Sequence, residues 1–344
     1  MSFDPDLTSI QEARDLLQAA RTAWETWRRA PQVQVDAVCA AMAEAGFQAS
    51  ERLGRLAQEE TGYGVAAHKK LKNEFGSRAV WESIRAEPTV DVIRHDPQRR
   101  LYEIAWPVGV VAALVPSTNP TSTTFFKAVK ARNAIVFSPH PAAKRCSYEA
   151  AQVMAQAAEA AGAPKGLIAC MQHVSLPGTN ELMTNRLTSI ILATGGTAMV
   201  RAAHSTGKPA YGVGPGNVPV YVDRSADLEK AARYIVASKA FDYSTICATE
   251  QAVIADRPIA AQLKSLMQAQ GAYFTSPQQT AALRRTLFHP DRSMNVGVVG
   301  KSADYLAAVA GFSVPAGTRV LVAPLTAVGR EEPLSHEKLT TALA

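Results

Sequence analysis

A cysteine between small residues is the side chain of this sequence best suited to nucleophilic chemistry. Cys247 lies in STICATE (244–250), which has the composition of a turn and precedes an apolar run. A thiolate is a strong nucleophile, and a turn of small residues lets a substrate reach it. A structural thiol is the alternative. The other cysteines fall inside helix or strand patterns, where a thiol acts as a packing residue: Cys39, Cys146 and Cys170.

An asparagine is the second candidate for chemistry. Asn119 stands in VPSTNP (115–120), directly after an apolar run, between Pro116 and Pro120. Because prolines stiffen the backbone, this amide would be held rigidly enough to donate hydrogen bonds to a developing oxyanion. An asparagine at such a position is equally suited to cap a helix. Both interpretations remain open from the residues alone.

Two adjacent glycines mark a possible anion site. Gly195 and Gly196 follow the apolar run at 190–193 and open a helical pattern. The free N–H groups and the dipole of a helix N-terminus favour a bound anion such as a phosphate. A tight turn requires the same residues, so that interpretation stays open too. The spacing differs from the glycine fingerprint of a standard dinucleotide fold.

Neither a metal site nor a disulfide framework is expected. None of the seven histidines forms a metal-spaced pair, and the four cysteines are scattered along the chain. The start, MSFDPDLTSIQEARD, lacks the basic and apolar regions of a signal peptide. No window approaches the roughly 18 apolar residues of a membrane span. We therefore expect a cytoplasmic protein that does not bind a membrane.

The positive charge of the chain is concentrated in its middle. The net charge is +6, and residues 104–240 hold 13 Lys and Arg against six Asp and Glu. Basic surfaces attract polyanions, but nucleic-acid binders interleave their cations with exposed aromatic residues. The pattern here favours a solvated surface or a phosphate-containing cofactor over nucleic acid, because small and apolar residues surround the central cations: Lys127, Lys130, Arg132, Lys144 and Arg145.

These candidates are carried by alternating helices and short apolar strands. Residues 9–28 are predicted to form an amphipathic helix with Ser9 and Glu12 at capping-box spacing, and two or three helices follow to about residue 85. The predicted strands lie within 101–116 and at 134–137, 166–171, 190–194, 218–222, 251–255, 295–299 and 319–323. The predicted helices between them are 147–161, 197–205, 226–240, 257–269 and 302–310.

This alternation predicts an α/β fold with parallel sheets covered on both faces. A length of 344 residues exceeds what one hydrophobic core usually serves, so two domains are expected. The candidate boundary lies near residue 240.

Taken together and in order, these segments resemble the aldehyde dehydrogenase superfamily, specifically its CoA-acylating branch. The match runs from about residue 10 to the last residue. The resemblance implies two doubly wound parallel-sheet domains, an NAD(P)-binding one at 1–240 and a catalytic one at 241–344. Family members continue past this point, so we expect the second domain to be represented in part. The motifs are VPSTNPTST (115–123), ARNAIVFSPHPAAK (131–144), ILATGGTAMVRAA (191–203), GKPAYGVGPGNVPV (207–220), ICATEQ (246–251) and EPLSHEKL (332–339).

The resemblance also implies roles for individual residues. Cys247 matches the family nucleophile, and Asn119 matches the side chain that completes the oxyanion hole with the Cys247 backbone N–H. Glu337 matches the acid that holds the nicotinamide ribose. The remaining cofactor-binding positions are Pro116 and Ser117 after one strand, Ser138 and His140 beside the adenosine half, and Thr194, Gly195 and Gly196 near the phosphates.

The implied activity is oxidation of a short-chain aldehyde to an acyl-CoA, with NAD or NADP as oxidant and coenzyme A as acyl acceptor. Acetaldehyde, propionaldehyde and sulfoacetaldehyde are substrates in the family. A homodimer or homotetramer is implied for the full-length enzyme. The sequence begins almost directly at its first helix, without the amphipathic tail that takes some relatives into bacterial microcompartments.

Three other functions are compatible with parts of the sequence. A hydrolytic aldehyde dehydrogenase needs a base to activate water, and hydrolytic relatives carry a Glu where this sequence has Val213. A thiol ionises near pH ~8.5 and needs less help, so Val213 favours transfer to CoA. A truncated, inactive paralogue that acts as a binding or assembly partner is the alternative from another class. A nucleic-acid binder ranks last.

Overall fold

The computed structural model describes residues 4–125 and 127–344 and divides into two compact units. Unit 1 is Met1–Thr61 with Lys69–Gly214, and unit 2 is Gly62–His68 with Pro215–Ala344. The boundary expected near residue 240 lies inside unit 2. The units divide earlier, between Gly214 and Pro215, because the strand at 219–222 and the helix that ends at residue 240 pack with the elements that follow them.

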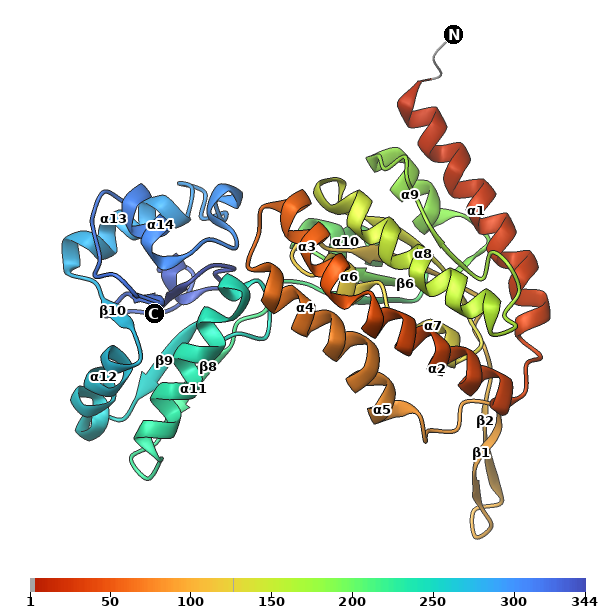
Figure 1. Cartoon of the computed structure of the whole chain (residues 1–344), viewed down its shortest axis with the longest axis horizontal. Helices are drawn as coiled ribbons and strands as arrows, with labels where there is room; N and C mark the ends of the chain where they lie inside the picture. The colour runs from red at the N-terminus through yellow and green to blue at the C-terminus, as the bar shows by residue number, and fades with distance from the viewer. Residues whose placement is uncertain (1–3, 126) are drawn as a thin grey trace. The chain divides into compact units, whose positions relative to one another are not determined.

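A five-stranded parallel sheet forms the centre of unit 1 (Figure 1). Its spatial order is β5-β4-β3-β6-β7, so the chain leaves the central strand in one direction and then returns to its other side. Two of its three inner strands, β3 and β4, are buried at every position, as expected for a sheet covered on two faces. The strands are β3 (Val110–Val115), β4 (Ala134–Pro139), β5 (Ile168–Cys170), β6 (Thr188–Thr194) and β7 (Ala210–Val213).

Helices cover both faces of this sheet. Because crossovers between parallel strands are right-handed, α8 lies on the face opposite α9 and α10. α1 packs against α9, and α2 packs against α8. The α/β expectation with a doubly wound sheet is confirmed for unit 1. Its helices are α1 (Pro5–Trp27), α2 (Gln32–Gln48), α3 (Ser50–Thr61), α4 (Ala66–Glu74), α5 (Val80–Ile84), α6 (Pro120–Thr123), α7 (Lys127–Lys130), α8 (Lys144–Ala160), α9 (Leu176–Thr184) and α10 (Thr197–His204).

The start of α1 differs from the sequence-based expectation. Asp4 is the N-cap, so Ser9 and Glu12 do not form a capping box. The Ser9 hydroxyl is buried and accepts a hydrogen bond from the Ser175 N–H (3.2 Å). The Glu12 carboxylate accepts two backbone N–H groups at 172–173. Both side chains therefore fasten α1 to the loop before α9, which local spacing alone does not reveal.

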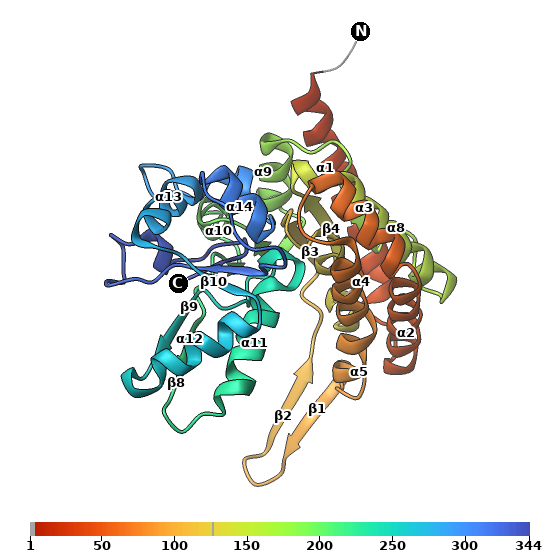
Figure 2. The same cartoon turned by 60° about the vertical axis from the view of Figure 1, so that its left-hand side comes forward.

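An antiparallel hairpin extends from unit 1 before the sheet begins. It consists of β1 (Asp91–Asp96) and β2 (Leu101–Ala105), and Figure 2 shows it as an arm leaving the sheet. Several of its apolar side chains, and two in the segment that follows, are exposed: Val92, Ile93, Leu101, Tyr102, Ile104, Trp106 and Val108.

Unit 2 has a second parallel sheet. β8 pairs with β9, and β10, β11 and β12 form a three-stranded sheet in that order. The backbone of Ala344 joins the two pieces, since Val253 N donates to its carbonyl (2.8 Å) and its N–H donates to the Gln251 carbonyl (3.1 Å). A second parallel sheet is thus confirmed. The strands are β8 (Pro219–Val222), β9 (Ala252–Ala255), β10 (Ala272–Phe274), β11 (Val320–Val322) and β12 (Ala342–Leu343).

The helices of unit 2 are α11 (Leu228–Ala240), α12 (Ala260–Ala269), α13 (Pro277–Leu287) and α14 (Ala303–Val309). The strand predicted at 295–299 is wrong, because that segment is a 3₁₀ turn. The Asn295 side chain accepts the Gly297 N–H (3.0 Å) and closes the turn, and Val296 is 71% exposed. Apolar residues alone do not make a strand where an asparagine can bond its own backbone.

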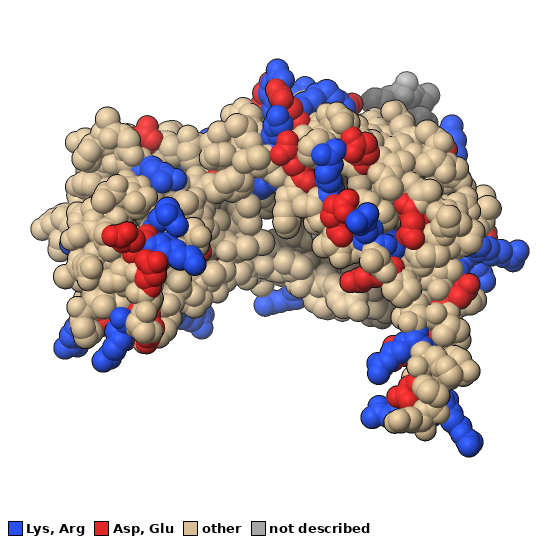
Figure 3. Space-filling view, turned by 60° about the horizontal axis from the view of Figure 1, so that its bottom comes forward, with Lys and Arg blue, Asp and Glu red and all other residues tan. Residues whose placement is uncertain are grey.

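Part of the basic middle segment is internal. The Lys130 ammonium is buried and pairs with Asp36 (2.6 Å), and Arg132 is also buried and donates to the Ala105 carbonyl (3.0 Å). On the face drawn in Figure 3, acidic side chains lie among the basic ones. The charge surplus therefore does not correspond to a uniform basic surface. Within residues 4–125 and 127–344, no helix is long and apolar enough to cross a membrane.

Candidate active site

The carboxyl edge of the sheet in unit 1 collects most of the predicted cofactor positions. β3, β4 and β6 all end there, and the order of strands reverses between β3 and β6. In open parallel sheets, ligands bind outside the carboxyl ends of the strands at such a switch point. The His140 N–H donates to the Val115 carbonyl (2.9 Å) and ties two of these loops together. The predicted positions at this edge are Pro116, Ser117, Asn119, His140, Thr194, Gly195 and Gly196.

Asn119 does not act as a helix cap. It occupies the N-cap position of α6, but its side chain makes no capping hydrogen bond. The Lys72 ammonium donates to Asn119 Oδ1 (2.7 Å), and Asn119 Nδ2 donates to Thr118 Oγ1 (3.2 Å). A cation on the amide oxygen fixes which end of the amide carries the donors. This orientation suits a hydrogen-bond donor role.

The double glycine leaves the N-terminus of α10 open. A Cβ built on Gly196 would meet nothing within 4 Å, and Gly196, as the N-cap, offers no side chain to the first N–H groups of the helix. Gly195 N donates to the Val213 carbonyl (3.1 Å), which holds the turn against β7. Open space in front of uncapped helical N–H groups fits an anionic phosphate of a dinucleotide.

Ser138 and His140 have different surroundings. The Ser138 hydroxyl is buried and shares a hydrogen bond with Thr179 Oγ1 (2.8 Å), so this side chain faces α9. His140 is exposed, and its Nδ1 accepts the Ala142 N–H (3.1 Å). Desolvation lowers the pKa of His140. The His140 side chain is therefore exposed at the edge, whereas the Ser138 hydroxyl is occupied by Thr179.

In unit 2, Cys247 stands exposed at the tip of a tight turn. Thr249 closes the turn, because its N–H (3.1 Å) and its hydroxyl (3.0 Å) both donate to the Ile246 carbonyl. The Thr249 hydroxyl also contacts Ser244 Oγ (2.7 Å), and both residues are buried. The sequence-based expectation of an exposed thiol on a small-residue turn is confirmed. Burial raises the pKa of the three remaining thiols: Cys39, to about 12, Cys146 and Cys170.

A strained segment leads into this turn, and sequence reasoning missed it. Asp242, Tyr243 and Ser244 all have φ between +47° and +63°, in the left-handed region that disfavours residues other than glycine. The buried Asp242 carboxylate accepts the Val65 N–H (2.7 Å) and the Thr245 hydroxyl (2.5 Å). These contacts hold the strained backbone in place. Three consecutive non-glycine residues give no sequence signal of such a conformation.

The segment Gly62–His68, far away in sequence, packs against the same aspartate. His68 Nδ1 accepts the Asp242 N–H (2.9 Å), and its ring stacks on Phe241 with 4.6 Å between centroids. Gly64 has φ +69°, and a Cβ there would lie 2.0 Å from Asp242 Oδ1. A glycine is thus required where this segment approaches the turn. The approach spans about 180 positions of sequence, beyond what a local pattern can show.

Glu337 and Cys247 meet at one glycine of unit 2. Gly216 N donates to Glu337 Oε1 (3.2 Å), and a Cβ added to Gly216 would lie 3.2 Å from the Cys247 carbonyl oxygen. Burial raises the pKa of the Glu337 carboxyl, an effect opposed by the Gly216 hydrogen bond and by Lys239. The predicted nucleophile and the predicted ribose-binding acid therefore flank the same backbone position.

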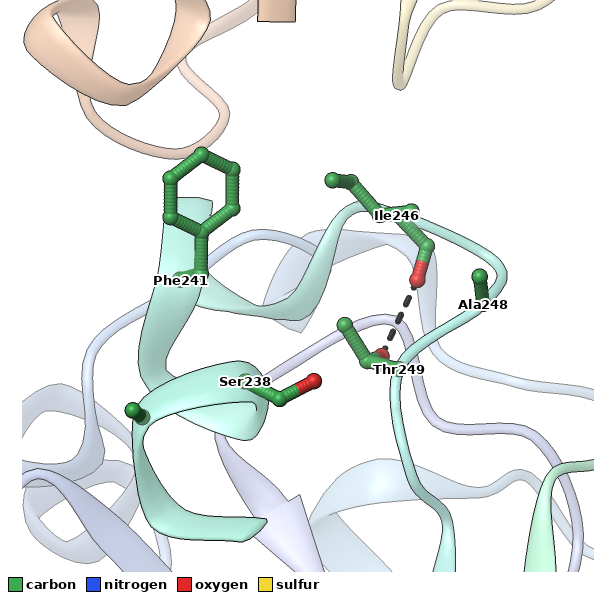
Figure 4. Close-up of a pocket in the computed structure, with 6 residues that line it drawn as sticks. Ser238, Phe241, Ile246, Ala248 and Thr249 are labelled. Atoms are coloured by element: carbon green, nitrogen blue, oxygen red, sulfur yellow. Dashed lines mark hydrogen bonds between the residues drawn. The ribbon is translucent and has the colours of Figure 1, made fainter. Parts of the chain in front are cut away.

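A pocket opens beside the nucleophile turn (Figure 4). It has a volume of about 420 Å³, and no charged side chain lines it. In Figure 4 the side chains come from the end of α11 and from the turn, which the Thr249–Ile246 hydrogen bond closes. Such a cavity can hold a small, uncharged organic group. The lining residues are Ala237, Ser238, Phe241, Ile246, Ala248 and Thr249.

Three or more His, Cys, Asp or Glu side chains that could jointly hold a metal ion do not occur in the part of the chain that the structure describes. The described residues instead offer a thiol, a carboxylate and open helical N–H groups.

Fold and site together define an α/β protein with a candidate nucleophilic cysteine and a candidate dinucleotide edge. Comparison with known proteins identifies the family: the Aldehyde dehydrogenase family profile matches residues 6–280. The chain therefore belongs to the aldehyde dehydrogenase family, and its similarity is to the acylating branch.

Individual relatives agree with this assignment. The crystal structure of an acetylating aldehyde dehydrogenase from Geobacillus thermoglucosidasius is 48% identical with a TM-score of 0.96, and the match covers 99% of this chain and 76% of that one. Propionaldehyde dehydrogenase of Rhodopseudomonas palustris with bound propionyl-CoA is 30% identical with a TM-score of 0.84, covering 96% and 74%.

Among curated proteins, the bifunctional aldehyde-alcohol dehydrogenase AdhE of Escherichia coli strain K12 is 38% identical over 341 residues, which are 98% of this chain. The match covers 38% of that relative, so the chain spans well under half of the bifunctional protein's length.

Proposed function

We propose that this chain carries the thioester chemistry of a CoA-acylating aldehyde dehydrogenase, which oxidises a short-chain aldehyde to an acyl-CoA with NAD or NADP. The observation that carries the proposal is the exposed Cys247 on its braced turn, with Glu337 on the other side of Gly216. Relatives named as acetylating or holding propionyl-CoA support the acylating reaction.

Cys247 performs the covalent step in this proposal. Its thiolate adds to the aldehyde carbonyl carbon, and the C=O π electrons move to oxygen to give a tetrahedral thiohemiacetal anion. Asn119 and the Cys247 backbone N–H are proposed to donate hydrogen bonds to that oxygen. Loss of hydride from the same carbon leaves an acyl thioester on Sγ. Attack by the CoA thiolate releases acyl-CoA and returns the Cys247 thiolate.

The proposed cofactor contacts combine the two units' candidate residues. Gly195 and Gly196 at the start of α10 would hold phosphates, and Glu337 would accept hydrogen bonds from the nicotinamide ribose. When bound, the nicotinamide supplies the hydride acceptor. The choice between NAD and NADP stays a prediction, as does a homodimer or homotetramer.

CoA is favoured over water as acyl acceptor. The position at which hydrolytic relatives carry a Glu is the C-terminal residue of β7, Val213, whose side chain is 51% exposed and cannot accept a proton. Water has a pKa far above that of a thiol, so hydrolysis without a base is slow, whereas a thiol supplies its own anion near neutral pH.

The pocket beside the Cys247 turn favours an uncharged aldehyde. Its lining is apolar apart from the hydroxyls of Ser238 and Thr249, and none of its lining residues carries a charge that could pair with an anionic substrate. Burying an unpaired sulfonate or carboxylate there would cost free energy. We therefore propose acetaldehyde or propionaldehyde rather than sulfoacetaldehyde as substrate.

The test is turnover with and without CoA. The purified chain would be incubated with NAD⁺ or NADP⁺ and short aldehydes, and reduced nicotinamide followed at 340 nm, with Cys247→Ala as control. We expect CoA-dependent turnover that the substitution abolishes. Equal turnover without CoA would instead show a hydrolytic enzyme. An absence of turnover from a folded sample that still binds the cofactor would contradict the proposal for this chain.

A further inference from the structure

Two lysine side chains lie buried beneath the Cys247 turn. Lys239, near the end of α11, and Lys338, next to Glu337, both have no exposed surface. Taking an ammonium group out of water is costly unless hydrogen bonds replace its hydration. Their partners therefore indicate what these side chains are for.

Lys338 connects three irregular backbone segments. Its ammonium donates to the carbonyl oxygens of Gln251 (3.0 Å), Leu334 (2.5 Å) and His336 (2.8 Å). An ammonium has three N–H donors, and here each donor has one carbonyl acceptor. Two of these carbonyls precede Glu337, and the third lies where the chain enters β9. The side chain thus fixes the course of the backbone that carries Glu337.

Gln251 relates the two lysines to each other. Its Oε1 accepts the Lys338 backbone N–H (2.7 Å) and the Lys239 ammonium (3.0 Å), and its Nε2 donates to the Thr249 carbonyl (3.2 Å). The Lys239 ammonium also donates to the Lys338 carbonyl (3.1 Å). One fully buried amide therefore contacts both lysines and the residue that closes the nucleophile turn.

The Lys338 carbonyl also contacts the segment that leads into the Cys247 turn. Ser244 Oγ lies 3.5 Å from the Lys338 carbonyl and 2.7 Å from Thr249 Oγ1. The segment on which Glu337 lies and the turn that carries Cys247 consequently share their anchoring atoms. We name this set of five side chains the lysine network: Lys239, Ser244, Thr249, Gln251 and Lys338.

We infer that Lys338, supported by Lys239, is a positioning residue that fixes the position of the Glu337 segment relative to the Cys247 turn. Loss of its three hydrogen bonds would loosen both at once, although it contacts neither the thiol nor the carboxylate. The importance of this relative position for catalysis rests on the proposed function, but the hydrogen-bonded link between the two segments does not.

The charge state of the network gives it a pH dependence. Burial lowers the pKa of Lys338 to about 7, against a smaller opposing effect of Glu332. Burial and the neighbouring Lys338 lower the pKa of Lys239 well below its ordinary value, while Glu250 and Glu337 act in the opposite direction. Below the pKa of Lys338 the buried ammonium donates to all three carbonyls at the cost of a buried charge, whereas above it the neutral amine has two N–H donors and no charge to bury. Because the pKa is lowered in the closed state, that state becomes more stable as the pH rises.

The test compares hydrogen exchange in the full chain and in Lys338→Met. Methionine keeps the volume of the side chain and removes every donor. We expect amide exchange to rise by about tenfold in peptides covering both 244–251 and 334–341, because buried carbonyls without donors destabilise both segments locally. Exchange in α13 should not change. Faster exchange in 334–341 alone would overturn the inference, since the turn would then be independent of Lys338.

A matched control separates the network from the general effect of removing a lysine. Lys264 is exposed on α12 in the same unit, and Lys264→Met should leave exchange in both peptides at the parent level. If Lys338→Met does not fold, the parent chain provides the test. After correction for intrinsic exchange, protection of both peptides should rise together between pH 7 and 9, because opening exposes Lys338 to water and lets it take up a proton, which becomes less favourable as the pH rises. Unchanged protection would overturn the inference.

Kinetics give a readout that a purely structural role would not move. In Lys338→Met we expect the KM for the nicotinamide cofactor to rise about tenfold, with a smaller fall in kcat, because Glu337 is the group displaced directly. A chain that never turns over would contradict the proposed function alone, since the exchange result stands without it. A normal cofactor KM in an active Lys338→Met enzyme would contradict the inference.

Discussion

At the carboxyl edge of the sheet in unit 1, backbone groups supply the candidate cofactor contacts, whereas in unit 2 buried side chains hold the candidate nucleophile. Gly196 faces open space with a relaxed φ of −67°. Cys247 instead follows three left-handed residues that Asp242 fastens to a distant segment. The edge in unit 1 requires only the ends of strands and a glycine without a side chain. The turn in unit 2 requires a specific set of buried hydrogen bonds. The second should therefore be far more sensitive to substitution.

The largest loss of stability is expected from a substitution at Gly64, in unit 2. Gly64→Ala places a Cβ 2.0 Å from Asp242 Oδ1 at a φ of +69°. We expect a loss of about 3 kcal/mol in the free energy of unfolding, from the left-handed backbone and the displaced carboxylate together. Urea unfolding of the variant and the parent measures it. A loss below about 1 kcal/mol would mean that the segment Gly62–His68 does not brace the turn.

The buried lysines predict how stability depends on pH. A base with a lowered pKa in the folded state binds its proton more readily when unfolded, so stability rises with pH from the folded pKa of Lys338, about 7, toward the ordinary value of 10.5. We expect a slope of about 1 kcal/mol per pH unit between pH 7.5 and 9, measured by urea unfolding. Lys338→Met should reduce the slope. A flat or falling profile in the parent would contradict these burial effects.

Ser138→Ala tests whether a predicted cofactor residue acts through its side chain. Its hydroxyl bonds Thr179 inside unit 1, so the variant should lose about 1 kcal/mol of stability and keep its affinity for the cofactor. Thermal unfolding and a fluorescence titration with NADH or NADPH would measure both quantities. Weakened cofactor binding at unchanged stability would restore a direct role for the hydroxyl.

The smallest stability effect is expected at the open glycine of unit 1. Alanine fits at Gly196 without strain, so Gly196→Ala should change the free energy of unfolding by at most about 1 kcal/mol, in the stabilising direction. The added methyl group would occupy space proposed for a phosphate, and cofactor affinity should fall. If affinity stays at the parent level in the same titration, the phosphates bind elsewhere.

The contrast between the regions also explains what the sequence could reveal. Strand ends followed by glycine or proline are local patterns, so the sequence places Asn119 and Gly195 each directly after a strand, and the strand order brings these ends to one sheet edge. The exposed turn of Cys247 was also readable, because small residues mark it. The compact units divide between Gly214 and Pro215, whereas the sequence suggests a boundary near residue 240, because the packing of α11 on α12 is not a local property.

Other features could not be predicted for the same reason. The contact of Gly64 with Asp242 joins positions separated by 178 residues, and a buried lysine such as Lys338 looks like a surface residue in a sequence. At 295–299 the sequence predicts a strand that is absent. The apolar residues there have the pattern of a strand, but Asn295 closes a 3₁₀ turn. Long-range hydrogen bonds decide these cases, and hydrophobic periodicity does not contain them.

The most direct test of the account is to trap the acyl group on Cys247. The chain would be mixed with propionaldehyde and NAD⁺ or NADP⁺ without CoA, digested, and its peptides analysed by mass spectrometry. The account predicts a propionyl thioester on Cys247, which disappears when CoA is added as propionyl-CoA forms. Propionate released without CoA, or an acyl group on a residue other than Cys247, would contradict it.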